Sequence, residues 1–133
     1  MSVQLSEKAR ALFDAKTFVT VATLQPDGSP QLSVVWVKRD QEHPDDLLIS
    51  TVEGRRKHLN LVKDPRISVL ANPPEAPYGY VEVRGEAELT TDGGRELIDE
   101  LSRKYTGKDY GDDGPDDVRV VIRVKARHVV DHL

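Results

Sequence analysis

The chain has 133 residues, of which 38% are hydrophobic and 32% charged, with no cysteine and a formal net charge of −4. This length predicts one domain, residues 1–133, with a core of moderate size. The lack of cysteine excludes disulfides, thiolate metal sites and cysteine nucleophiles, and the acidic balance argues against nucleic-acid binding. The sequence shows no signal peptide and no long apolar run, so we expect a cytoplasmic protein without a membrane partner.

The first half of the sequence predicts one helix and three strands. A short helix over 6–15 begins at Ser6, a residue type typical of the N-cap position. Two strands follow at 18–24 and 31–39, and the Pro-Asp-Gly sequence between them predicts a hairpin. The apolar run 47–51 predicts a third strand.

The second half predicts two more helices and three more strands. The helices are expected over 54–65 and 92–107, and the strands over 67–72, 80–89 and 118–127. Segment 80–89 alternates apolar and charged residues, which predicts a strand with one buried and one solvated face. The acidic segment 109–117 is expected to be a mobile, solvated loop. On the last strand, the residues expected to face the core are Val118, Val120, Ile122, Val124 and Ala126.

The connections between these strands are short and do not alternate regularly with helices. This order favours an α+β fold with an antiparallel, barrel-like sheet of about six strands over a doubly wound parallel sheet. Trp36 lies in the middle of the predicted strand 31–39, so we expect it in the core.

Three consecutive cations mark the junction between the third strand and the second helix. Arg55, Arg56 and Lys57 follow Gly54, directly after the strand that ends at Thr51. The first turn of a helix has free N–H groups and a positive dipole end, where cations are mildly unfavourable. The cluster therefore predicts either a bound anion such as phosphate or a solvated, salt-bridged helix start.

Other side chains carry weaker signals. The four histidines lie in separate segments and form no two-histidine zinc motif, so no metal site is expected. No P-loop and no nucleophile elbow are present, which argues against NTP use and nucleophilic hydrolysis. Tyr78 and Tyr80 flank Gly79 after a proline-rich turn, and this pair either covers a flat ring or anchors a loop to a strand.

The order of these motifs resembles the pyridoxamine-phosphate-oxidase-like split β-barrel superfamily, and within it the class B flavin/deazaflavin oxidoreductases. The matching stretches are FVTVATLQPDGSPQLSVVWV, LLISTVEGRRKHLNLVKDPRISVL and YVEVRGEAELT, which together cover nearly the whole chain. The most specific block is R-x-K-x-x-N-L-x-x-D-P-R at 55–66, preceded by A-T-L-x-x-D-G-x-P-x-x-S at 22–33.

The resemblance implies a six-stranded antiparallel split β-barrel with peripheral helices, and a homodimer with two cofactor sites at the subunit interface. It implies cofactor contacts from Gln31, Ser33 and Val35 along the ring system, from Ser50, Thr51, Arg55, Arg56 and Lys57 at the phosphate, from Asn60 near the cofactor tail, and from Tyr78 and Tyr80 of the partner subunit. No catalytic acid is apparent among these residues, so water is the expected proton source.

The C-terminus separates this chain from true pyridoxamine phosphate oxidases. Those enzymes carry an arginine-rich substrate segment with tryptophan, whereas this chain ends in VKARHVVDHL. The chain therefore looks more like the branch that uses coenzyme F-420, a deazaflavin. The resemblance implies an F-420-dependent reductase that transfers a hydride to a small electrophilic substrate. The alternatives are an FMN-binding oxidoreductase on the same fold, a non-catalytic flavin or deazaflavin store or sensor, and a structural dimer with a vestigial site.

Overall fold

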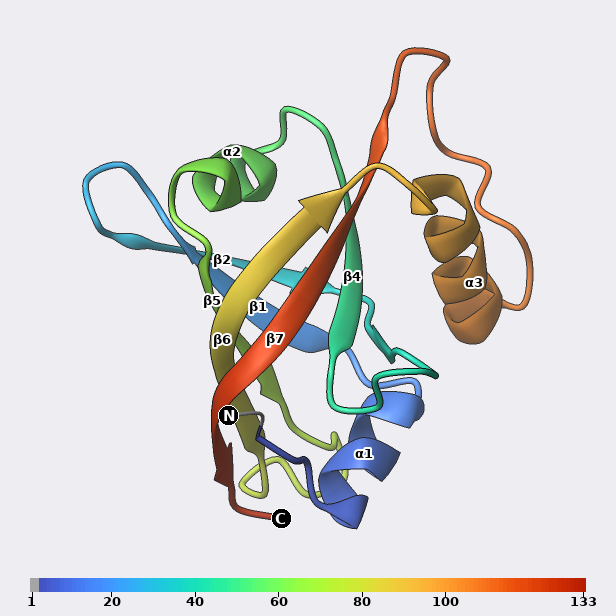
Figure 1. Ribbon diagram of the computed structural model, residues 1–133. Helices are drawn as coiled ribbons and strands as arrows, with labels where there is room; N and C mark the ends of the chain where they lie inside the picture. Colours follow the sequence, from blue (N-terminus) through green and yellow to red (C-terminus); the bar gives the residue numbers. More distant parts are fainter. Residues whose placement is uncertain (1–2) are drawn as a thin grey trace.

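Seven antiparallel strands form one curled sheet in the computed structural model, which describes residues 3–133 (Figure 1). The helices are α1 (Glu7–Asp14), α2 (Arg56–Lys63) and α3 (Gly94–Thr106). The strands are β1 (Val19–Leu24), β2 (Pro30–Val35), β3 (Lys38–Arg39), β4 (Leu47–Val52), β5 (Arg66–Ala71), β6 (Val81–Thr90) and β7 (Arg119–Asp131). Their order in the sheet is β2-β1-β5-β6-β7-β4-β3. Among residues 3–133, no helix has the length and apolar character needed to cross a membrane.

The predicted α+β class and antiparallel barrel are confirmed, with seven strands in place of six. The extra strand arises because the predicted strand 31–39 is interrupted at Trp36 and Val37. Before the interruption β2 pairs with β1, and after it β3 pairs with β4. The two strands that come from this segment, β2 and β3, are therefore the two edge strands of the sheet.

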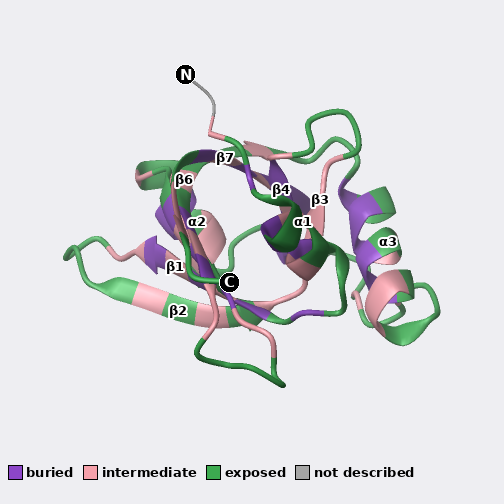
Figure 2. Ribbon diagram, turned by 90° about the horizontal axis from the view of Figure 1, so that it is seen from below, coloured by how far each residue is buried: buried purple, intermediate pink, exposed green. Residues whose placement is uncertain are grey.

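The core lies inside the curl and is formed by buried residues of β1, β4, β5, β6 and β7, whereas β2 has no buried residue (Figure 2). Val81 and Val83 of β6 are fully buried, as the alternation predicted. Phe13 of α1 joins the same cluster, because the helix packs across one end of the barrel. Val118 does not face the core as expected. It precedes β7 and is 41% exposed.

The long β6–β7 pair bends at a β-bulge. The register shifts between Arg84 and Gly85, opposite β7. A Cβ atom on Gly85 would lie 2.1 Å from the backbone oxygen of Lys125, so only glycine fits this contact. Bulges of this kind bend a strand and increase its twist, which helps the sheet to curl into a barrel.

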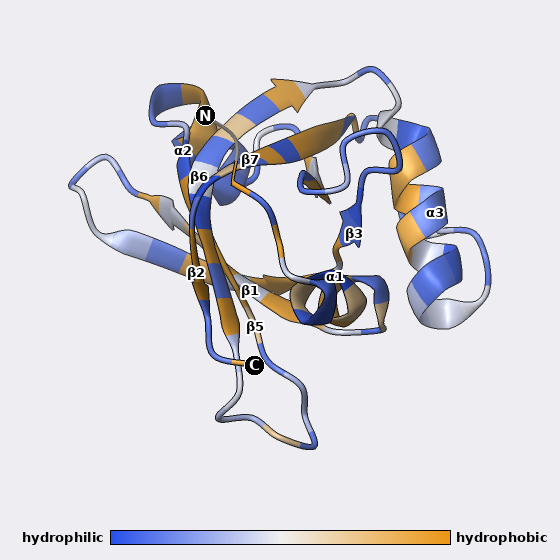
Figure 3. Cartoon of the chain, turned by 60° about the horizontal axis from the view of Figure 1, so that its bottom comes forward, coloured by the Kyte–Doolittle hydropathy of each residue, from blue (hydrophilic) through white to orange (hydrophobic). Residues whose placement is uncertain are grey.

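The barrel remains open between β2 and β4. On one side β4 pairs with β7 along its whole length, but on the other side it pairs with β3 only through Leu47 and Leu48. From Ile49 to Val52, no strand of residues 3–133 lies beside that second edge. The hydrophobic side of α3 faces the sheet beside this opening, and it buries Leu97 and Leu101 (Figure 3).

Candidate functional site

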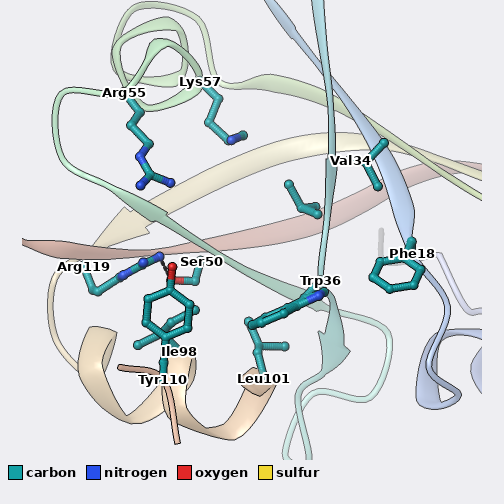
Figure 4. A pocket seen from close by; sticks show the side chains of 11 residues that line it. Phe18, Val34, Trp36, Ser50, Arg55, Lys57, Ile98, Leu101, Tyr110 and Arg119 are labelled. Carbon is teal, nitrogen blue, oxygen red and sulfur yellow. Dashed lines mark hydrogen bonds between the residues drawn. The ribbon is translucent and has the colours of Figure 1, made fainter. Parts of the chain in front are cut away.

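A cavity of about 400 Å³ lies in the opening between β2 and β4, and α3 and the loop 107–118 form its other wall (Figure 4). This volume is within the usual range for small-molecule sites, roughly 300–1,000 Å³. The lining residues are Phe18, Val34, Val35, Trp36, Ser50, Arg55, Lys57, Ile98, Leu101, Tyr110 and Arg119. The cavity therefore has a cationic end at the start of α2 and an aromatic end at Phe18 and Trp36.

The cationic end is built by a turn after β4. Gly54 has a left-handed backbone conformation with φ of 92°, and its N–H donates to Nδ1 of His58 at 3.0 Å. The turn places Arg55 at the N-cap of α2 and Lys57 in its first turn. Neither cation forms a salt bridge with another residue in the range 3–133.

Crowding of positive charge is strongest at Lys57. Burial lowers the pKa of its ammonium group, and the neighbouring charges of Arg55 and Arg119 lower it further. Arg55 and Arg56 are exposed, as at a solvated helix start, whereas Lys57 is half-buried and lines the cavity. An anion placed among the three cations would relieve their repulsion and would also meet the positive end of α2. The geometry therefore favours an anion site over a solvated helix start.

Arg119 is the third cation that lines the cavity, and it was not among the residues selected from the sequence. Its guanidinium donates to Asp113 through Nη2 at 2.6 Å and Nε at 2.9 Å, and Nη1 lies 3.4 Å from Oγ of Ser50. Burial works to lower the pKa of Arg119, but hydrogen bonds and charge from Asp113 raise it above its ordinary value. Arg119 therefore stays charged at the cavity wall. In the sequence it is a single arginine two residues after the acidic segment 109–117.

The acidic loop forms a wall of the cavity and is tied to α3. Arg95 on α3 pairs with Asp113 at 3.1 Å and donates to the backbone oxygen of Tyr110 at 2.5 Å. Asp99, also on α3, accepts the backbone N–H of Tyr110 at 3.0 Å. Most of the segment 109–117 is exposed, as expected for a solvated loop, while Tyr110 and Asp113 are half-buried against α3. The contacts with α3 bring Tyr110 into the cavity wall.

The aromatic end is a stack of rings. The Trp36 ring lies 5.3 Å from the Tyr105 ring, with 10° between their planes. The Tyr105 hydroxyl donates to the backbone oxygen of Thr17 at 2.6 Å and accepts the N–H of Val37 at 3.2 Å. The expected core position of Trp36 is therefore corrected, since its ring is half-buried and lines the cavity.

Two of the residues selected from sequence carry buried hydroxyls without a partner. Oγ of Ser33 and Oγ1 of Thr51 have no hydrogen-bond partner among the described residues. Ser50 and Thr51 are consecutive on β4, so their side chains point to opposite faces of the strand. Ser50 lines the cavity, whereas Thr51 is buried on the inner face. A buried polar group without a partner is costly, which makes a polar ligand or water favourable near these groups.

The structure brings only some of the predicted site residues to the cavity. Those that line it are Val35, Ser50, Arg55 and Lys57. Asn60 is buried instead and donates to Thr23 at 3.1 Å and to Gln25 at 3.2 Å, which ties α2 to the first hairpin. Arg56 lines a second cavity of about 630 Å³ on another side of α2. Gln31 contacts Thr23 and does not line the first cavity.

The two predicted tyrosines lie far from the cavity within one chain. Val81, the first residue of β6, pairs with Asp131 at the end of β7, whereas Arg119 begins β7 at the cavity. Tyr78 is 94% exposed, and Tyr80 stacks on His132 at 4.8 Å. Neither tyrosine can reach the cavity of its own chain.

Comparison with known proteins assigns the family. The family profile described as pyridoxamine 5'-phosphate oxidase matches residues 5–132. A solved F-420 reductase is 26% identical, with a TM-score of 0.81 over 95% of this chain and 98% of that one. A conserved hypothetical protein from Mycobacterium tuberculosis is 25% identical, with a TM-score of 0.77 over 98% of this chain and 87% of that one.

A third solved structure supports the fold alone. A putative pyridoxamine 5'-phosphate oxidase from Listeria innocua is 18% identical, with a TM-score of 0.72 over 96% of this chain and 98% of that one. The matched segment spans every strand and helix described above. The superfamily inferred from the motifs is thus confirmed, and the chain belongs to the pyridoxamine 5'-phosphate oxidase family.

Proposed function

We propose that the chain is a reductase that binds coenzyme F-420 in this cavity and delivers a hydride to a small electrophilic organic substrate. The observation that carries the proposal is the convergence of Arg55, Lys57 and Arg119 beside an aromatic wall. A phosphate-bearing, flat-ringed cofactor needs both features. The F-420 reductase among the similar structures supports the choice of cofactor.

The residues present fit such a group. Arg55, Lys57 and Arg119 would bind the phosphate, since charge-assisted hydrogen bonds from guanidinium and ammonium groups suit phosphate oxygens. The Ser50 hydroxyl lines the same cavity and would add a neutral hydrogen-bonding group beside the cations. Val35 and Trp36 would lie along the ring system.

The cofactor and the chain would contribute different parts of the reaction. The reduced cofactor supplies the hydride when it is bound. The chain would position the cofactor through its three cations, and the buried side chains of Ile98 and Leu101 would keep water from that wall of the cavity.

We also propose that a second copy of the chain covers the outer face of β2, β1 and β5. Leu32 and Val34 of β2 are 61% and 67% exposed there, and Leu70 of β5 is 39% exposed. Such a homodimer would place Tyr78 and Tyr80 near the partner's site, as the resemblance implies. The cytoplasmic location expected from the sequence stays a prediction.

The proposal is tested by parallel titration of the protein with F-420 and with FMN. The chain contains one tryptophan, and Trp36 lines the cavity, so its fluorescence should be quenched as the site fills. We expect saturable quenching by F-420, followed by oxidation of reduced F-420 when electrophiles are added. Binding of FMN without binding of F-420 would mean that the cofactor is FMN and not F-420.

The same experiment separates the remaining alternatives. An FMN-binding oxidoreductase would use the same phosphate contacts, because neither the cations nor the hydroxyls distinguish the two rings. A store or sensor would bind a cofactor, but the reduced cofactor would not be oxidised when any of the candidate acceptors is added. Failure to bind either cofactor would favour a structural dimer with a vestigial site.

A further inference from the structure

Two consecutive residues of α3 hold the backbone at the interruption between β2 and β3. Val37 lies in this interruption, and no ladder pair of the sheet includes it. Its N–H donates to the hydroxyl of Tyr105 at 3.2 Å, and its backbone oxygen accepts Nζ of Lys104 at 2.7 Å. Val37 is fully buried, where an unpaired backbone group would be costly. The end of α3 therefore takes the place of the missing strand neighbour.

Tyr105 also supports the indole of Trp36. The two rings are stacked, as described above, with 10° between their planes. The Tyr105 ring is itself anchored, because its hydroxyl donates to the backbone oxygen of Thr17 and burial raises the pKa of this phenol. Tyr105 thus contacts both the side chain of Trp36 and the backbone of the next residue, Val37. An indole held at both points has few rotamers left.

One face of the Trp36 indole is available to a ligand. Leu101 and Tyr105 lie four residues apart on one face of α3, and both pack in the same cluster as Trp36. Figure 4 shows the Trp36 ring nearly edge-on, with Leu101 on one side of it and Arg55 and Lys57 on the other. Because Trp36 lines the cavity, the indole face turned away from α3 is the one that a ligand in the cavity can contact.

We propose that Tyr105 is a positioning residue, which fixes the Trp36 indole so that its free face stacks on the flat ring of the bound cofactor. This inference rests on the proposed function, because that function puts a flat-ringed, phosphate-bearing molecule in the cavity. The face of an indole is electron-rich, so offset stacking on an electron-poor ring such as an oxidised flavin or deazaflavin is favourable. Tyr105 is not among the described residues that line the cavity, so it acts through Trp36.

The test measures cofactor affinity in a double-mutant cycle. F-420 and FMN are titrated into wild type, Tyr105→Leu, Trp36→Leu and the double variant, and binding is followed through the fluorescence of the cofactor itself. We expect each single variant to weaken binding roughly two- to tenfold, the effect of one lost aromatic stack. The double variant should lose no more than Trp36→Leu alone, because Tyr105 acts through Trp36. Inorganic phosphate, added as a competitor, should bind all four proteins within twofold of one another.

Two further variants separate positioning from stability. Tyr105→Phe keeps the stacked ring and should bind the cofactor within twofold of wild type. Ser102→Ala removes a hydrogen bond to Thr106 on the same helix, away from the cavity lining, and should do the same. Trp36 is the only tryptophan of the chain, so its fluorescence anisotropy in the free protein reports the mobility of this indole. The anisotropy should fall in Tyr105→Leu and stay unchanged in Tyr105→Phe and Ser102→Ala.

Several outcomes would overturn the proposal. These are unchanged cofactor affinity in Tyr105→Leu or Trp36→Leu, a double variant that binds more weakly than Trp36→Leu, a loss of phosphate binding as large as that of the cofactor, and a Tyr105→Phe variant as weak as Trp36→Leu. If Tyr105→Leu does not fold, Trp36→Leu and Tyr105→Phe still decide the question. A wild-type protein that binds neither F-420 nor FMN would overturn the proposed function, and the anisotropy would still show whether Tyr105 fixes the indole.

Discussion

Arg119 and Asp113 form the most deeply buried ion pair among residues 3–133, with side-chain exposures of only 6% and 9%. The pair joins the first residue of β7 to the acidic loop, and so fixes the cavity wall. Asp113→Ala would leave the Arg119 charge buried and unpaired. Removal of one partner of a buried pair costs about 3–5 kcal/mol, so the free energy of unfolding in urea should fall by about that amount. Asp112→Ala, in the same loop, should change it little.

The same pair predicts a dependence of stability on pH. Hydrogen bonds and charge from Arg119 hold the pKa of Asp113 below its ordinary value, with Arg95 contributing. The stabilisation is therefore fully present above the ordinary aspartate pKa of 3.8 and is lost as the pH falls through the lowered value. The difference in stability between wild type and Asp113→Ala should shrink as the pH falls below 3.8. A constant difference across that range would contradict the pairing.

Charge removal tests the proposed phosphate contacts. In the double variant Arg55→Ala/Lys57→Ala, each lost charge-assisted hydrogen bond should cost about 1.5–3 kcal/mol of cofactor binding. Lys63→Ala removes a cation from the last turn of the same helix and should bind the cofactor as wild type does. Unchanged affinity in the double variant would mean that the phosphate binds elsewhere.

The lowered pKa of Lys57 predicts that cofactor affinity depends on pH. A bound anion raises this pKa again, so binding takes up protons where the free ammonium group has begun to titrate. Affinity should therefore be highest below the pKa of the free protein's Lys57 and fall as the pH rises through it. Lys57→Arg stays charged and should flatten this profile.

Lys104 predicts that stability also rises with pH in the alkaline range. Burial lowers the pKa of its ammonium group to about 8, from 10.5, although it donates to the backbone oxygens of Phe13 and Val37. Between these values the unfolded chain binds the proton more tightly, so this residue opposes folding below pH 8 and does so less as the pH rises toward 10.5. Stability of wild type relative to Lys104→Met should therefore increase over this range in urea titrations. A flat difference would show that Lys104 is solvated.

Substitution of Asn60 distinguishes a structural role of its side chain from a role in cofactor binding. Its amide donates to Thr23 and Gln25, and truncation would leave these acceptors without that partner. Asn60→Ala should lower the free energy of unfolding by about 1–3 kcal/mol. We expect cofactor affinity within twofold of wild type when the folded protein is titrated. A larger loss of affinity with little loss of stability would support the contact with the cofactor tail that the family motif implies.

The proposed dimer is tested by a charge on its apolar face. Leu32→Glu would place a carboxylate in the interface and should convert a dimer to a monomer in light scattering after size exclusion. Val62 is similarly exposed but lies on α2, so Val62→Glu should leave the dimer intact. A wild-type protein that is monomeric at all concentrations would remove this part of the proposal.

Local patterns predicted the fold better than they predicted the site. Alternation along 80–89 identified the inner face of β6, and the Pro-Asp-Gly turn identified the first hairpin, because both signals depend on neighbouring residues. The interruption at Trp36 was missed, since it depends on β3 crossing to pair with β4. Arg55 and Lys57 could be selected from the sequence because they belong to one run of three cations. Arg119 and Tyr110 come from later segments that only tertiary packing brings beside them.

The half-paired edge of β4 has a consequence for the solution behaviour of the protein. Backbone groups of Ile49–Val52 on that side have no neighbouring strand within the described chain, and an open edge is a template for pairing with other chains. The cationic turn that follows β4 places like charges on approaching copies and so disfavours such pairing. A ligand in the opening would neutralise those charges while it fills the space. Resistance to aggregation and occupancy of the cavity by a ligand therefore both depend on the open edge Ile49–Val52 and the cationic turn after it.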